Sequence, residues 1–247
     1  MREPGRCGIA AVLLASLLGC DDSSGPEVTD QANPAPASGA PALALFARPF
    51  VGDYRVLNYF DHDIPNGGAV PSGGYQLTWR GEHSIPGIHT GGYDGHTGID
   101  WIMPVGTPLL AMADGLVLFA GETGPVYCGL TNETLPSTIV RIGHRASNDE
   151  VYVVVYNHMS QAEVRTNDRV VAGQQIGRSG ASGCVGRDGT PHLHLETLRI
   201  TNTNNGAAAS VDPYGWEGPG VDPWSQRPAG ATSVWLWRAG EAPSLVR

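Results

Sequence analysis

The sequence is poor in charge and in long apolar runs. Charged residues make up 16% of its 247 positions, the formal net charge is −9, and no long run of like charge occurs. A nucleic-acid partner is therefore not expected, because nucleic-acid surfaces need clustered basic residues. The apolar run at residues 9–18 is too short for a transmembrane helix, which needs about 20 residues.

Glycine and proline are abundant, at 34 and 19 residues, which favours many turns and short strands over long helices. Between residues 90 and 200 no segment has helical periodicity over more than a turn or two. β-Branched runs recur instead, as at residues 137–142 and 151–156. Asp114-Gly115, between two apolar runs, is typical of a hairpin turn. The sequence predicts a mainly β fold of antiparallel strands.

The N-terminus has the pattern of a targeting signal. Arg2 and Arg6 precede the apolar run, and Leu17-Leu18-Gly19-Cys20 ends it. This ending resembles the lipobox of bacterial lipoproteins, which implies a lipoprotein signal peptide at residues 1–19 and a lipid on Cys20 that holds the protein to a membrane. A plain signal peptide is the alternative. Residues 20–42, rich in Pro, Ala, Ser and Gly, are expected to form a disordered tether. We expect an exported protein of the bacterial cell envelope.

Only Cys128 and Cys184 remain once Cys7 leaves with the signal and Cys20 serves as the anchor. Two cysteines in an exported chain favour a disulfide, and no CxxC spacing occurs. Two free or metal-binding thiols are the alternative.

The segment Pro191-His192-Leu193-His194-Leu195-Glu196 reads as a strand with two imidazoles on one face. Side chains two apart on a strand share a face, at about 6.6 Å along the chain. Leu193 and Leu195 would then face the core. Taken alone, this segment is better explained by a pair of exposed or hydrogen-bonded histidines than by a metal site.

Three further residues could join this pair in a metal site. His96 and Asp100 stand four apart where a Gly-rich loop enters a strand, and His158 follows the strand at residues 151–156. Zinc binds imidazole and carboxylate, and a catalytic site uses three such ligands plus water. Spacing alone does not say which three bind, and both His192 and His194 could. Asp61-His62-Asp63 is also metal-capable, but such a triplet is more often a turn or a hydrogen-bond hub.

Taken in order, these motifs resemble those of the lysostaphin/LytM-type zinc metallopeptidases, which cut the peptides of bacterial peptidoglycan. The similarity spans roughly residues 85–200. The motifs are His96-Thr97-Gly98-Ile99-Asp100, Pro104-Val105-Gly106-Thr107-Pro108, Ala113-Asp114-Gly115, Tyr156-Asn157-His158-Met159-Ser160, Val171-Ala172-Gly173-Gln174-Gln175-Ile176-Gly177, Ser179-Gly180 and the segment 191–196. The family usually ends its last motif in Phe-Glu, where this chain has Leu195-Glu196.

The resemblance implies a site and a fold. One Zn²⁺ per chain would be held by His96, Asp100 and His194, while His192 and His158 would stand beside the metal and take part in catalysis. We assign proton transfer to His192 and stabilisation of negative charge to His158. The implied fold is a compact antiparallel β-sheet or sandwich with long loops around a groove. A bridge between Cys128 and Cys184 would stiffen the wall of that groove.

We therefore expect a zinc peptidase domain with an N-terminal extension at residues 43–205 and an aromatic, Pro-rich C-terminal cap at 206–247. Aromatics of the cap could instead bind sugar rings. The expected function is that of a monomeric zinc endopeptidase acting on cross-bridge or stem peptides of peptidoglycan. The alternatives are a non-catalytic wall-binding or hydrolase-activating module and a zinc peptidase acting on Gly-rich proteins.

Overall fold

The computed structural model describes residues 43–63, 75–84, 95–129, 131–186 and 188–245. The predicted signal peptide, Cys20 and the tether lie outside the described residues. Within them the one helix is a 3₁₀ turn, Pro223–Gln226. None of the described helices is long and apolar enough to cross a membrane. The prediction of a mainly β fold is confirmed.

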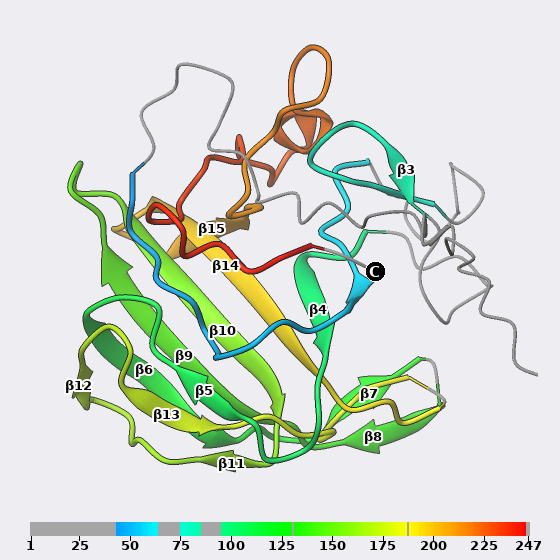
Figure 1. Cartoon of the computed structure of the whole chain (residues 1–247), viewed down its shortest axis with the longest axis vertical. Coiled ribbons are helices and arrows are strands. Elements are labelled where there is room, and N and C mark those ends of the chain that lie inside the picture. The colour runs from blue at the N-terminus through cyan, green and yellow to red at the C-terminus, as the bar shows by residue number, and fades with distance from the viewer. Residues whose placement is uncertain (1–42, 64–74, 85–94, 130, 187, 246–247) are drawn as a thin grey trace, which may run out of the picture. The chain divides into compact units, whose positions relative to one another are not determined.

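The main sheet has eight strands, all paired antiparallel (Figure 1). The order is β1 (Val56–Asn58), β4 (Gly98–Ile102), β14 (His192–Asn202), β10 (Val151–Met159), β9 (Thr138–Arg145), β6 (Gly115–Glu122) and β12 (Arg169–Val170), with β15 (Ala207–Ser210) also on β14. The long strand β14 pairs with β4 through its first half and with β15 through its second half. Its first half is thereby placed in the interior of the sheet, between β4 and β10.

Three smaller sheets complete the described strands. They are β11 (Gln161–Ala162), β13 (Gln175–Arg178) and β5 (Pro108–Leu110) in one sheet; β2 (Gln76–Leu77) and β3 (His83–Ser84) in another; and β7 (Val126–Cys128) and β8 (Glu133–Leu135) in the third.

The prediction of a hairpin at Asp114-Gly115 is wrong. Strand β5 before it pairs with β13, whereas β6 after it pairs with β9 and β12, so the turn carries the chain from one sheet to another. Asp114 accepts a hydrogen bond from the backbone N–H of Ala172. A Cβ at residue 115 would lie 2.6 Å from the carbonyl oxygen of Gly143, so this crossing requires glycine.

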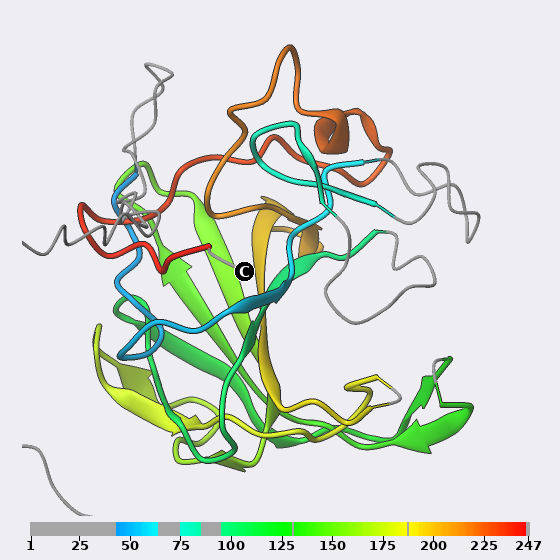
Figure 2. The same cartoon turned by 45° about the vertical axis from the view of Figure 1, so that its right-hand side comes forward.

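The first and last described segments pair with each other across the main sheet, as Figures 1 and 2 show. Phe46 forms a bridge with Trp237, and the backbone N–H of Leu45 donates to the carbonyl of Leu236. Phe46 also packs edge-to-face against Tyr152 of β10. The core therefore extends from the main sheet to both flanking segments.

The aromatic residues of the C-terminal segment are largely part of this core. Tyr214, Trp224 and Trp237 are at most 4% exposed. Buried rings cannot offer a face to a sugar, so these three residues act in packing.

A buried charge cluster joins the N-terminal extension to the C-terminal segment. The ring of His62, 0% exposed, lies between the carboxylates of Asp222, 2.9 Å from Nδ1, and Asp212, 3.2 Å from Nε2. Both aspartates begin an Asp-Pro-aromatic repeat, at Asp212 and at Asp222. Burial opposes protonation of the ring, but its hydrogen bonds to the two carboxylates outweigh burial and raise the pKa of His62 to about 9. His62 is therefore a cation at neutral pH.

This cluster predicts a loss of stability in alkali. A histidine pKa raised on folding stabilises the protein fully below about pH 6.5, and this contribution disappears as the pH rises through about 9. We expect the free energy of unfolding to fall by about 3 kcal/mol over this range. Urea unfolding at about pH 6 and at about pH 10 measures this change in the free energy of unfolding.

The variant His62→Gln should lose this pH dependence and be destabilised at neutral pH by about 3–5 kcal/mol, because it leaves two buried carboxylates without a cation. His83→Gln, at an exposed histidine, is the control and should behave like the wild type. An unchanged alkaline profile in His62→Gln would contradict the assignment.

Candidate active site

Strands β4 and β14 bring Asp100 and His194 together. They are direct partners in the antiparallel register, so their side chains share one face of the sheet. His194 Nδ1 lies 2.9 Å from Asp100 Oδ1. Leu193 and Leu195 are 0% and 2% exposed on the opposite face, as the alternation predicts.

His96 completes the group from the chain just before β4. Its Nε2 lies 3.0 Å from His194 Nδ1 and 3.2 Å from Asp100 Oδ1. Its Nδ1 lies 2.7 Å from the carbonyl oxygen of Tyr59. Because a carbonyl only accepts, Nδ1 carries the hydrogen and the lone pair of Nε2 points toward Asp100 and His194.

These three residues fit a metal ion. The distances between their facing atoms are 2.9, 3.0 and 3.2 Å. In a tetrahedral zinc site with zinc–ligand bonds of about 2.0 Å, two ligand atoms lie about 3.3 Å apart, which is close to these values. Two imidazole lone pairs and a carboxylate at such distances repel one another unless a proton or a metal cation stands between them. Two histidines and one aspartate are also a donor set that zinc accepts.

His192 and His158 lie beside this group. The rings of His158 and His192 are 4.7 Å apart, and His158 is 5.9 Å from the ring of His194. His192 Nε2 is 3.9 Å from Asp100 Oδ2. The structure therefore brings together all five residues singled out in the sequence, although their roles remain predictions.

A β-bulge aims His158 at the site. The sequence places His158 just after a strand, but β10 continues to Met159. From Tyr156 to Met159 strand β10 advances three residues while its partner β9 advances two, from Val140 to Thr138. His158 takes up the extra residue with a φ of 59°, a left-handed conformation that is strained for a non-glycine residue.

Both flanking histidines are held through Nδ1. His158 Nδ1 donates to the carbonyl of Ser182, and His192 Nδ1 donates to the carbonyl of Thr190, each at 2.8 Å. In the neutral rings this leaves Nε2 of both as an acceptor.

The buried charged groups of the site shift one another's pKa. Burial opposes ionisation of Asp100, but the positive charge of His96 and a hydrogen bond from His194 hold the pKa of Asp100 well below its usual range. Burial also disfavours the charged form of His96, but the Asp100 carboxylate prevails and raises the pKa of His96. Burial, and then His192 and His194, lower the pKa of His158 to about 3.

A disulfide joins strand β7 to a loop near the histidines. Cys128 of β7 bonds to Cys184, with Cα atoms 5.3 Å apart, which confirms the predicted bridge. Cys184 lies two residues after Ser182, whose carbonyl accepts from His158 and whose hydroxyl donates to the carbonyl of Met159. The bridge thus ties β7 to the loop that orients His158.

Sequence patterns do not find Asn58, which also contacts this group. Its Nδ2 donates to Asp100 Oδ2 at 2.7 Å. The two residues are 42 apart in sequence and meet only because β1 pairs with β4.

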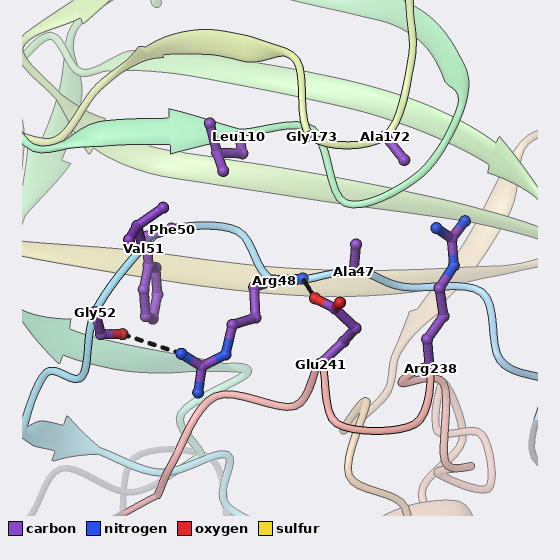
Figure 3. A pocket seen from close by; sticks show the side chains of 10 residues that line it. All are labelled: Ala47, Arg48, Phe50, Val51, Gly52, Leu110, Ala172, Gly173, Arg238 and Glu241. Carbon is purple, nitrogen blue, oxygen red and sulfur yellow. Dashed lines mark hydrogen bonds between the residues drawn. The ribbon is translucent and has the colours of Figure 1, made fainter.

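A cavity of about 380 Å³ lies elsewhere and contains none of the five residues (Figure 3). Its charged groups are Arg48, Arg238 and Glu241. Figure 3 shows Arg48 donating to the carbonyl of Gly52, while Glu241 accepts from the backbone N–H of Arg48. The cavity has no histidine or cysteine, so it is not a second candidate for the same chemistry.

Comparison with known proteins agrees with this geometry. Residues 94–213 match Peptidase family M23. The chain is 39% identical over 112 residues to the glycyl-glycine endopeptidase ALE-1 of Staphylococcus capitis, covering 45% of this chain and 27% of that protein. It is 34% identical over 109 residues to the peptidoglycan DD-endopeptidase ShyC of Vibrio cholerae, covering 44% of this chain and 21% of that protein.

The crystallised catalytic domain of lysostaphin from Staphylococcus simulans is 25% identical, with a TM-score of 0.37, and the match covers 65% of this chain and 89% of that one. The alignments to the two curated relatives cover about a quarter of their length. The chain carries a Peptidase family M23 domain, and the recognition made from its motifs is confirmed.

Gly98 provides a test of the site's packing. A Cβ at this position would lie 2.7 Å from the carbonyl of Leu195 and 2.8 Å from Cε1 of His194. We expect Gly98→Ala to displace His194, to weaken zinc binding and to cost about 1–3 kcal/mol of stability. Gly124→Ala is the control, because its Cβ would meet nothing within 4 Å. Zinc titration measures the affinity and thermal unfolding measures the stability of each variant. Equal zinc affinity and stability in the two variants would contradict this packing.

The disulfide is tested by alkylation followed by peptide mapping. Without reductant, Cys128 and Cys184 should remain unmodified and appear as one linked pair of peptides. Reduction should expose both thiols and lower the free energy of unfolding by about 2–4 kcal/mol. Modification of both thiols in the unreduced, unfolded protein would show that no bridge forms.

Proposed function

We propose that this protein is an exported zinc endopeptidase that cleaves peptides of bacterial peptidoglycan. The observation that carries the proposal is the convergence of His96, Asp100 and His194, with His158 and His192 beside them. The M23 domain supports it, as do relatives whose names specify a glycyl-glycine endopeptidase and a peptidoglycan DD-endopeptidase. A non-catalytic wall-binding module would not need all five residues.

One zinc ion per chain would be held by His96, Asp100 and His194. Bound there, it would polarise the carbonyl of the scissile peptide bond and lower the pKa of a water toward 7. Asp100 contributes the one negative charge among the ligands. The carbonyl of Tyr59 fixes the tautomer of His96 in which Nε2 would be available to the ion.

His192 is proposed to move the proton. Its Nδ1–H is held by Thr190, so Nε2 can accept a proton from the attacking water and return it to the leaving amine. The nearby Asp100 carboxylate would stabilise the ring while it is charged. His158 is proposed to stabilise the negative charge that develops on the carbonyl oxygen. That role requires a hydrogen on Nε2, which burial of His158 opposes, so the two histidines need to be tested separately.

The N-terminal pattern supports a proposal for the position of the protein in the cell. A lipid on Cys20 and a tether at residues 20–42 would hold a monomeric catalytic domain near the membrane, where the peptidoglycan of the same cell is within reach. The net charge of −9 supports this, because it would not steer the protein onto foreign anionic walls.

The proposal is tested by digesting purified peptidoglycan. The zinc-loaded protein should release soluble peptides with new termini, detected by mass spectrometry, and Asp100→Ala should release none. Substrates with and without glycine in the cross-bridge distinguish the two activities named for the relatives. The variant His192→Ala should have a kcat lowered by about 10²–10⁴-fold while zinc stays bound.

The variant His158→Ala tests the stabilising role of His158 in the same assay. His83→Ala is the control for both variants.

No products from a protein that binds zinc stoichiometrically would contradict the enzymatic proposal and favour a binding module. Cleavage of Gly-rich proteins without cleavage of peptidoglycan would contradict the proposed substrate.

A further inference from the structure

The segment from Asn58 to Asp61 lies outside the matched residues 94–213, yet it contacts two of the three proposed metal ligands. Asn58 Nδ2 donates to Asp100 Oδ2 at 2.7 Å, and the carbonyl of Tyr59 accepts from His96 Nδ1 at 2.7 Å. The backbone N–H of Asp61 donates to the carbonyl of His96 at 2.8 Å. The carboxylate of Asp61 accepts from the backbone N–H of Gly95 at 2.9 Å.

We propose that Asn58 is a positioning residue for the metal: through Asp100 it sets the affinity of the site for zinc. The proposal rests on the function given above. Asp100 Oδ1 faces His96 and His194, while Oδ2 receives the hydrogen bond from Asn58. Asn58 therefore holds the oxygen that faces away from the two histidine ligands. Fixing this oxygen fixes the rotation of the whole carboxylate.

Stability alone does not account for an asparagine at this position. Asn58 is 3% exposed, and its Oδ1 has no hydrogen-bond partner among the described residues. A buried carbonyl without a partner lowers stability. The hydrogen bond to Asp100 is the contact that requires an asparagine here, because an apolar side chain would have no unpaired oxygen but could not donate to the carboxylate.

The neighbouring residues make this contact rigid. The backbone N–H of Tyr59 donates to Gln76 Oε1, and its hydroxyl donates to the carbonyl of Leu245. His62 is fixed between Asp212 and Asp222. Gln76, Leu245 and Asp222 lie outside the matched residues 94–213, so the segment is held largely by parts of the chain that flank the M23 domain and can act as a fixed reference for the ligands.

The test compares zinc dissociation constants of the wild type, Asn58→Leu and Thr197→Val, measured by competition with a chromophoric chelator. Loss of a hydrogen bond to a metal ligand typically weakens binding by about 10–100-fold, and we expect this for Asn58→Leu. Thermal unfolding of each variant without zinc checks that it is folded when its zinc affinity is measured. Thr197→Val is the control, because Thr197 is equally buried on β14 and its hydroxyl has no hydrogen-bond partner among the described residues. It should bind zinc like the wild type.

Wild-type affinity in Asn58→Leu would overturn the inference and leave the proposed function intact. A wild type that binds no stoichiometric zinc would instead overturn the proposed function itself. If Asn58→Leu does not fold, Asn58→Ala, which needs less space, is measured in the same way, and wild-type affinity in that variant likewise overturns the inference.

Discussion

The carboxylate of Asp100 is buried among three imidazoles and one carboxamide, and the candidate site is built around it. An isolated buried carboxylate is costly, so it needs partners that are positive or that donate hydrogen bonds. Strand β4 places it opposite His194, the loop before β4 supplies His96, and β1 supplies Asn58. Each partner comes from a different part of the chain, which makes the site a product of the sheet's register.

A second buried charge cluster provides the rigidity that this arrangement needs. His62 is a cation held by two aspartates, whereas Asp100 is an anion surrounded by histidines. The short segment between Asn58 and His62 connects the two clusters. Through it the C-terminal aromatic segment, which packs into the same core, supports the orientation of His96 and Asp100. Segments outside the M23 domain thus contribute directly to its site.

The five central residues could be predicted from the sequence because ordered motifs carry them. Alternate side chains of a strand face opposite sides, and this alternation in the segment 191–196 assigned His192 and His194 to one face and the leucines to the core.

Other features depend on pairing between distant strands. Asn58 meets Asp100 only in the folded sheet, and the bulge at His158 arises from the register in which β10 pairs with β9. Asp114-Gly115 has the local chemistry of a hairpin, but the preference of β5 for β13 overrides it. Local patterns describe individual strands, whereas the choice of partner strand is a tertiary decision.

The central claim is that the metal takes one histidine of the His192/His194 pair and leaves the other free to act on the substrate. Crystals of the zinc-loaded protein, with anomalous scattering measured on both sides of the zinc edge, test this directly. The account predicts one zinc peak bonded to His96 Nε2, Asp100 Oδ1 and His194 Nδ1, with His192 and His158 unbonded to it. A peak bonded to His192 in place of His194, or the absence of a peak among these residues, would contradict it.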